Sequence, residues 1–413
     1  MNVNKMGKIV WLVLIFLTNI IFLLDINASD RLLIFLNVIL ILCTVFYNRF
    51  SAISLTSLFF NMLWVAILIQ KNTGVSYGLL QADLFPLNGN KILNCSFIFN
   101  DVLSVCSILL NINEHEKNIL QYIDELQTVK PFIYFCNFVA IVFTVVAFPR
   151  LSLNITGSER FDMLLPGNAW NQLAVVGLIF NLKYLKKYTS VQLTYLFCIF
   201  WFLANGERVD MTGLFLGMLI YFFNVSKKVK FETLLKGASI LIFMTLVMLS
   251  VGNNRIGSSF SDLRGIFTFS TVSDVAYLLN ITIDYINKFS LFNGQIILSN
   301  LYNLIPFMEP KVDFSSVMSS VYPFPGGEPI ISAGLLDFGV KGIIFTTVID
   351  NLFLRFILNF KCRFWGYEYL LILCSIPRIV WYGRSYVFSG LIFFIPIMLI
   401  IEFFFNKAFV KYK

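Results

Sequence analysis

Long apolar segments recur along almost the entire chain, and short polar segments separate them. A transmembrane helix needs about 20 mostly apolar residues, within a range of about 17–25. The candidate spans are residues 9–24, 32–47, 52–70, 93–112, 131–148, 168–183, 190–204, 208–224, 235–251, 334–358, 367–382 and 386–405. We therefore predict an all-α fold, a polytopic transmembrane helical bundle of about 12 spans (about 11–13). The count depends chiefly on 93–112, which contains Asn100 and Asp101, and on the short segment 190–204.

The composition agrees with a membrane protein. Of the 413 residues, 58% are hydrophobic and 13% are charged, and the mean hydropathy is +0.79. Soluble domains are about 25% charged, so this chain has too little charge to cover a soluble surface. The formal net charge is +8. In a membrane protein such an excess lies in cytoplasmic loops and against lipid headgroups. We therefore expect membrane lipid, and no nucleic acid, as a partner.

The distribution of lysine and arginine predicts the orientation, because cytoplasmic loops carry an excess of both. If the N-terminus is cytoplasmic, the strongly basic loops at 183–187, 227–236 and 355–363 all lie inside. We therefore predict that both termini are cytoplasmic. If 93–112 does not cross the membrane, every later loop changes side and the interpretation of the outer residues reverses.

One external loop is much longer than the others. We predict that residues 1–251 hold the N-terminal spans, 252–333 form this large external loop, and 334–413 hold the C-terminal spans. The loop contains several prolines and a segment, 271–288, in which apolar residues recur at helical spacing. Long loops with structure of their own are usually functional. The loop is therefore expected to contain short helices and part of the functional site.

Arginines on the predicted outer side run against the positive-inside trend. The candidates among them are Arg160, Arg208, Arg255, Arg264, Arg378 and Arg384. A guanidinium binds phosphate oxygens through two parallel hydrogen bonds and stays charged, so arginines at the mouths of several helices predict a pyrophosphate site. The alternative is that they face lipid headgroups or form salt bridges. Glu207, Asp210 and Asp262 are near enough in sequence to be the partners of such salt bridges.

Carboxylates near the predicted membrane boundary are further candidates, because ionisable groups at membrane depth are functional by default. Glu207 and Asp210, which flank Arg208, fit this description best. Weaker candidates of the same kind are Asp101, Asp337 and Asp350. For these three, a buried and satisfied polar residue is an equally good interpretation.

The most distinctive segment of the chain is VYPFPGGEPIISAGLLDFGVKG (321–342). Its prolines and glycines predict an irregular re-entry before the span at 334–358. Glu328 lies in this segment and is suited to act as a general base toward a sugar hydroxyl; the alternative is a rigid turn in which Glu328 pairs with an arginine. Tyr322 is a candidate for stacking on a sugar ring, with loop packing as its alternative. The other aromatic candidates in the loop are Tyr302, Phe307 and Phe324.

The sequence lacks the residue patterns that several kinds of chemistry require. The sole histidine, His115, lies in a predicted cytoplasmic stretch, and the seven cysteines are scattered without a CxxC pair. No cluster of ligands predicts zinc, and neither a P-loop nor a GxGxxG motif is present. We therefore expect no metal and no cofactor, and no ATP-driven transport by this chain alone.

Two segments of the chain resemble a known family. They are NGERVDMTGLFLG (205–217) and PFPGGEPIISAGLLDFGVKG (323–342). The first is similar to the arginine-containing motif that opens a helix in the bacterial O-antigen and capsule repeat-unit polymerases of the Wzy type. The second is similar to the glycine-rich stretch of that family, which leads into FG…G. The predicted spans and the large loop in the C-terminal half also resemble the family, so the architectural likeness covers most of the chain.

The resemblance implies a metal-independent membrane glycosyltransferase with a C-type fold. Such an enzyme transfers a growing glycan from undecaprenyl pyrophosphate onto the next lipid-linked repeat unit, on the outer face of the bacterial inner membrane. Arg208, Arg255 and Arg264 would then stabilise the leaving pyrophosphate. Arg160, Arg378, Arg384, Glu207, Asp210 and Tyr322 are further substrate-binding candidates. Glu328 is the proposed base, and Glu207, Asp210 and Glu159 are its alternatives. A separate chain-length regulator is the protein partner that the resemblance adds.

Three other functions compete with a polymerase. An O-antigen ligase shares the general architecture but is expected to have a histidine in the external loop, and residues 252–333 contain none. A lipid-linked oligosaccharide flippase would usually show internal repeats and evenly short loops, which this sequence lacks. A lipid-phosphate sugar transferase needs an acidic pair in its first external loop, and Asp25 and Asp30 match that pattern poorly.

Overall fold

The computed structural model describes residues 3–24, 29–64, 67–68, 88–149, 169–205, 207, 209–225, 270–302 and 312–410. The regular structure in these residues is helical throughout, as the sequence predicts. The chain forms two compact units that alternate along the sequence. Unit 1 consists of residues 1–116, 269–359 and 379–385, and unit 2 consists of 117–268, 360–378 and 386–413.

Five helices in the described part of the chain are long and apolar enough to cross a membrane. They are Gly7–Leu24, Asp30–Asn48, Gly89–Leu109, Lys130–Ala147 and Val387–Phe409. Their length and composition support a helical membrane protein, whereas the count of about 12 spans, the orientation and the membrane-based division of the chain stay predictions. The predicted span at 235–251 lies outside the described residues.

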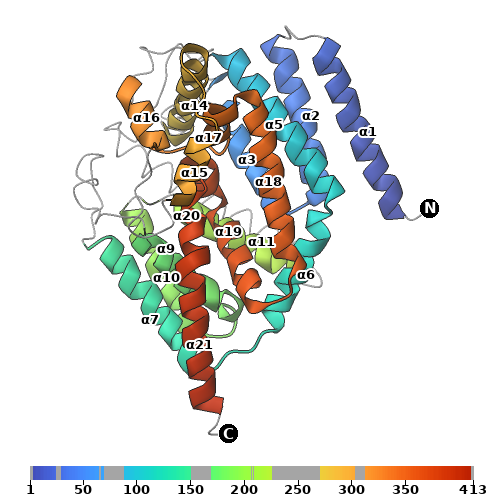
Figure 1. Ribbon diagram of the computed structural model, residues 1–413. Helices are drawn as coiled ribbons and strands as arrows, with labels where there is room; N and C mark the ends of the chain where they lie inside the picture. The colour runs from blue at the N-terminus through green and yellow to red at the C-terminus, as the bar shows by residue number, and fades with distance from the viewer. Residues whose placement is uncertain are drawn as a thin grey trace, which may run out of the picture. The chain divides into compact units, whose positions relative to one another are not determined.

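Unit 1 begins with a group of helices whose contacts include buried amides. These helices are α1 (Val3–Leu24), α2 (Asp30–Asn48), α3 (Ala52–Asn61) and α5 (Gly89–Leu109), and α1, α2 and α5 lie side by side (Figure 1). The Asn100 amide nitrogen on α5 is 2.8 Å from Asn37 Oδ1 and 2.8 Å from Asn61 Oδ1. Asn19 of α1 donates to the carboxylate of Asp101 over 2.7 Å. Polar side chains hold apolar helices together in this way, which explains the two polar residues in the predicted span at 93–112.

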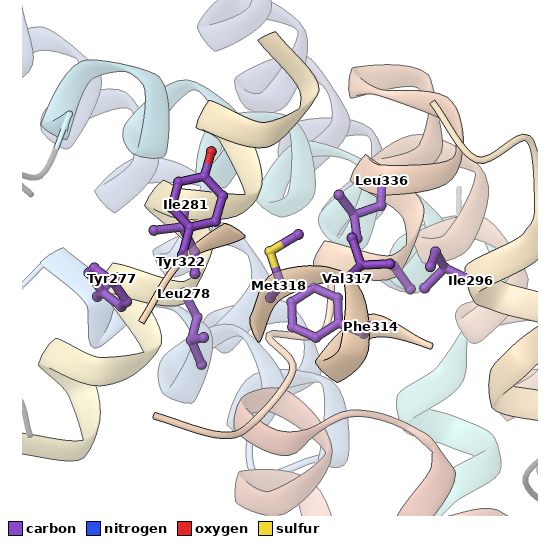
Figure 2. Packing of buried hydrophobic residues seen from close by; sticks show 10 residues of the cluster. Tyr277, Leu278, Ile281, Ile296, Phe314, Val317, Met318, Tyr322 and Leu336 are labelled. Atoms are coloured by element: carbon purple, nitrogen blue, oxygen red, sulfur yellow. The ribbon is translucent and has the colours of Figure 1, made fainter. Parts of the chain in front are cut away.

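Four helices that follow in unit 1 share one apolar core. They are α14 (Ser270–Lys288), α15 (Gln295–Tyr302), α16 (Phe314–Val321) and α17 (Ser332–Phe338). Figure 2 shows side chains of all four gathered together, among them Leu278, Ile296, Met318 and Leu336. The predicted helix at 271–288 is confirmed as α14. Glu328 lies in the segment that connects α16 to α17.

The predicted span at 334–358 is two helices, α17 and α18 (Val340–Asn359), separated at Gly339. Gly339 has φ +61°, a conformation that glycine adopts readily. The backbones of Gly334 and Gly342 touch, because neither residue has a side chain to separate them. A test of apolar length alone does not detect such a break.

Unit 2 contains most of α6 (Ile112–Glu125) and of α19 (Arg363–Tyr382). Its other helices are α7 (Lys130–Ala147), α9 (Ala169–Asn181), α10 (Thr189–Ala204), α11 (Val209–Val225), α20 (Ser385–Ser389, whose first residue is in unit 1) and α21 (Ile395–Val410). A Cβ atom at Gly213 or Gly217 of α11 would collide with Cys374 of α19. These two glycines, spaced as in GxxxG, therefore let α11 and α19 pack backbone to backbone.

Candidate functional site

The segment that carries Glu328 packs closely on the last turn of α19. The Ile330 backbone N–H donates to the Val380 carbonyl over 3.0 Å. Gly327 has φ +99°, and a Cβ at this position would be 3.0 Å from the Trp381 carbonyl oxygen. Only a glycine gives both this conformation and this close approach. The two segments are therefore held together by their backbones, and Glu328 lies between the two contacts, at Gly327 and Ile330.

A second glycine brings the turn against the Glu328 side chain. Gly383 has φ +94°, and a Cβ there would be 3.0 Å from Glu328 Oε2. The next residue in the chain is Arg384. The absence of a side chain at position 383 therefore allows the carboxylate of Glu328 to lie beside the turn that carries an arginine.

Arg384 is held by an aspartate on α18. Its Nε is 2.9 Å and 3.0 Å from the two carboxylate oxygens of Asp350, and its Nη2 is 2.6 Å from Oδ2. Burial lowers the pKa of Arg384, but the Asp350 charge and hydrogen bonds and the Glu328 charge raise it, and the net shift is upward. Asp350 is about 15 Å along α18 from Val340, at about 1.5 Å per residue. The arginine thus meets α18 near its middle rather than at its end.

Glu328 itself is buried, with 8% of its surface exposed. The amide nitrogen of Asn300, on α15, donates to Glu328 Oε1 over 3.2 Å. Burial raises the pKa of Glu328 to about 7, although the Arg384 charge and the Asn300 hydrogen bond act in the opposite direction. We call Glu328, Arg384, Asp350 and Asn300 the Glu328 site. A carboxylate in this state is about half ionised at neutral pH and can accept a proton there.

Unit 2 contains a different arginine cluster. Arg378 donates from Nε to Asp210 Oδ1 over 2.7 Å and from Nη2 to Oδ2 over 2.8 Å, and Nη2 is 3.4 Å from Glu207 Oε1. All three side chains are at most 8% exposed. We call these residues the Arg378 cluster. The close packing of α11 on α19 at Gly213 brings Arg378 within reach of Asp210, which agrees with the salt-bridge interpretation of this arginine.

Other candidate residues are placed as follows. Tyr322 is 5% exposed and packs in the core of α14–α17, and its hydroxyl donates to Asp284 over 2.8 Å. Its environment agrees with loop packing rather than with a free stacking surface. Arg160, Arg208, Arg255 and Arg264 lie outside the described residues, as do Glu159 and Phe307. No group of three His, Cys, Asp or Glu side chains in the described residues is arranged to hold a metal ion.

Sequence reasoning missed Asn300 of the Glu328 site and Gly383 beside it. Asn300 carries no charge and belongs to no motif, so nothing in the sequence marks it. Gly383 precedes Arg384 in a predicted hairpin, where a glycine is usual, and its contact with Glu328 depends on packing. Asp350 was one of several weaker carboxylate candidates, and its arginine partner also depends on packing.

Comparison of the chain with protein-family models, with curated proteins and with solved structures found no match. The function is therefore inferred from the residues of this chain, from their geometry and from the resemblance of its two motifs.

Proposed function

We propose that the protein is an oligosaccharide repeat-unit polymerase, a glycosyltransferase of the bacterial inner membrane. Its substrates are glycans linked to undecaprenyl pyrophosphate, and the reaction takes place on the outer face of the membrane. The growing glycan moves from its lipid pyrophosphate to the free end of a new lipid-linked repeat unit. A chain-length regulator is the protein partner that we propose with this function.

The reaction requires a base and a site for the leaving group. A hydroxyl oxygen of the acceptor sugar attacks the anomeric carbon of the donor and forms the new glycosidic bond. The bond between that carbon and the phosphate oxygen breaks, and its electron pair leaves with the lipid pyrophosphate. The hydroxyl proton passes to the carboxylate of Glu328, which later releases it to water. The products are a glycan longer by one repeat unit and a free lipid pyrophosphate.

The observation that carries the proposal is the environment of Glu328. A buried carboxylate beside Arg384, with a pKa of about 7, matches what a general base needs at neutral pH. Glu207 and Asp210, its main rivals, are both bound to Arg378 in a buried cluster. A carboxylate held by an arginine is a weak proton acceptor, because the positive charge stabilises its ionised form. Glu328 is therefore the better base.

The arrangement of Arg384 revises its proposed role. Nε and Nη2 of Arg384, the edge that would bind a phosphate with two parallel hydrogen bonds, already bind Asp350. We assign Arg384 to tuning the charge of Glu328. Stabilisation of the leaving pyrophosphate is assigned to Arg208, Arg255 and Arg264, with Arg160 as a further candidate.

The proposal is tested with purified protein and the lipid-pyrophosphate repeat unit of its host, without nucleotide sugar. We expect a ladder of products on a gel, spaced by one repeat unit, with Arg208→Ala and Arg255→Ala variants losing most of it. A folded wild-type protein that forms no ladder would contradict the proposal. The same lipid would then be given to a translocation assay and to a transfer assay with a lipid A core acceptor, which detect a flippase and a ligase respectively.

A further inference from the structure

Asp337, near the end of α17, binds the beginning of another helix. Its side chain is fully buried, and its two carboxylate oxygens accept the backbone N–H groups of Ile296 over 3.0 Å and Ile297 over 2.8 Å. Both donors lie in the first turn of α15, where backbone N–H groups have no partner within the helix. Helices usually obtain such a cap from a residue just before them. Here the cap comes from a residue 40 positions away in sequence.

Asp337 also binds the turn just before α15. Asn293 has φ +51° and Gly294 has φ +94°, so the chain turns sharply immediately before the helix. The Asn293 N–H donates to the Asp337 carbonyl over 3.1 Å. Asp337 therefore fixes both the turn and the first residues of α15, by its backbone and its side chain. A carboxylate at a helix N-terminus is also stabilised by the helix dipole.

The position of α15 matters because this helix carries Asn300. The Asn300 amide reaches Glu328 Oε1, and it is the one neutral side chain of the Glu328 site. α15 has only eight residues, and helices this short are marginal without tertiary contacts. The hydrogen bonds from Asp337 to its first turn stabilise this helix. So does the packing of Ile296 in the α14–α17 core, which Figure 2 shows.

We propose that Asp337 is a positioning residue for Glu328, because its cap on α15 places the amide of Asn300 against the Glu328 carboxylate. This assignment deepens the proposed function, on which its catalytic meaning rests. The contact itself is independent of that function. Asp337 has no hydrogen bond to Glu328, and its positioning effect passes through α15.

The test uses the titration of Glu328, followed by difference infrared spectroscopy with a Glu328→Gln variant as reference. In the part of the chain that the structure describes, the charged and polar groups that act on Glu328 are Arg384, Asn300, Asp313 and Asp337. The Asn300 hydrogen bond lowers the pKa of Glu328, whereas the negative charge of Asp337 raises it. Loss of the Asn300 hydrogen bond should therefore raise the titration midpoint of Glu328, whereas loss of the Asp337 charge should lower it.

We expect Asn300→Ala to move the Glu328 midpoint upward by about one pH unit, the size of one hydrogen bond to a charged group. Asp337→Ala should also move it upward, and should have no upward effect when Asn300 is already alanine. A downward shift in Asp337→Ala, or the same upward shift in both backgrounds, would overturn the proposal. If Asp337→Ala does not fold, Asp337→Asn is judged by the same criterion, since its amide can accept only one of the two bonds.

Asp313 provides the matched control. It caps α16, where its carboxylate accepts the Ser316 N–H over 2.7 Å, and its charge also raises the pKa of Glu328. Asp313→Ala therefore removes a helix cap and a negative charge but keeps the two hydrogen bonds of Asp337 to the first turn of α15. We expect no upward shift, and an upward shift equal to that of Asp337→Ala would show that any lost cap has this effect.

The titration requires no substrate, so it separates this inference from the proposed function. If the expected shifts occur but no glycan ladder forms, the positioning role of Asp337 is supported and the proposed polymerase function is contradicted. If the ladder forms but the shifts do not occur, the polymerase function is supported and the positioning role of Asp337 is contradicted.

Discussion

The Glu328 site and the Arg378 cluster use the same residues in two different ways. Each contains one arginine, one aspartate that binds its Nε and Nη2 atoms, and one glutamate. In the Arg378 cluster, the side chains of Arg378 and Asp210 are 8% and 2% exposed. In the Glu328 site, those of Arg384 and Asp350 are 17% and 34% exposed. The first is closed to solvent and the second is partly open.

The difference follows from the elements that build each group. In the Arg378 cluster, Asp210 and Arg378 lie on α11 and α19, which glycines bring into backbone contact, and these charges are shut away from water. The Glu328 site lies between an irregular segment and a turn, both of which need glycines with positive φ. A buried and fully paired arginine cluster is expected to be structural. A carboxylate near a partly open arginine pair can change its protonation during a reaction. Similar composition therefore does not imply a similar role.

The largest difference between the two groups should be in how much stability the protein loses when the arginine of each is replaced. Arg378→Ala removes the guanidinium that binds two buried carboxylates, which should cost about 3–5 kcal/mol of the free energy of unfolding. Arg384→Ala leaves Asp350 one-third exposed and hydrated, so its cost should be about 1 kcal/mol or less. Denaturant unfolding of both variants in detergent measures the two values. Equal costs would show that the two groups do not differ as we argue.

The pH dependence of glycan transfer should carry the signature of Glu328. The base works only when ionised, and the ionised fraction falls about tenfold for each pH unit below its pKa of about 7. The initial rate should therefore fall about 50-fold between pH 7, where Glu328 is about half ionised, and pH 5, and level off above about pH 8. Rates measured across this range with the lipid-linked repeat unit check the prediction. A rate that is flat across the range would argue against Glu328 as the base.

Replacement of either arginine by glutamine should separate the two groups further. The positive charge of Arg384 lowers the pKa of Glu328, so Arg384→Gln should move the acid limb of the rate profile upward by about one pH unit. Arg378→Gln, measured at a temperature at which it stays folded, should leave the limb in place. A limb that moves equally in both variants would mean that Glu328 does not respond specifically to Arg384.

The smallest effect concerns the turn beside Glu328. Gly383→Ala would strain a residue with φ +94° and push its methyl group against the Glu328 carboxylate. Gly326→Ala is the matched control, because its φ is +88° and nothing lies within 4 Å of its Cβ. Both should lose about 1 kcal/mol of stability, and only Gly383→Ala should lower the transfer rate as well. Equal rates in the two variants would contradict the close contact with Glu328.

Much of the helical architecture could be predicted from the sequence. Helices α2, α5 and α7 match the predicted segments at 32–47, 93–112 and 131–148, because apolar length is a local property of the chain. The division of 334–358 at Gly339 was not predicted, since it depends on the contact between Gly334 and Gly342. The hydrogen-bond partners of Asn100 on α5 could not be predicted either, because they lie on other helices.

The candidate site could be predicted only in part. Residue chemistry identified Glu328, Arg378 and Arg384 as candidates, but not which carboxylate each arginine would bind. Those partners are 34 and 168 positions away in sequence, so packing alone decides them. The spacing of Gly213 and Gly217 was a usable signal for the contact between α11 and α19. No comparable signal marks Asn300, because a single amide in a loop helix has no distinctive pattern.

The most direct test of the account compares Glu328→Gln with Glu207→Gln in glycan transfer at pH 8. Both variants replace a buried carboxyl group by an amide of the same size. If Glu328 is the base, Glu328→Gln should fold normally and lose about 10²–10⁴-fold in rate, whereas Glu207→Gln should lose stability and keep its rate within about tenfold. A Glu328→Gln variant that transfers at the wild-type rate, or a Glu207→Gln variant that suffers the larger loss, would contradict the account.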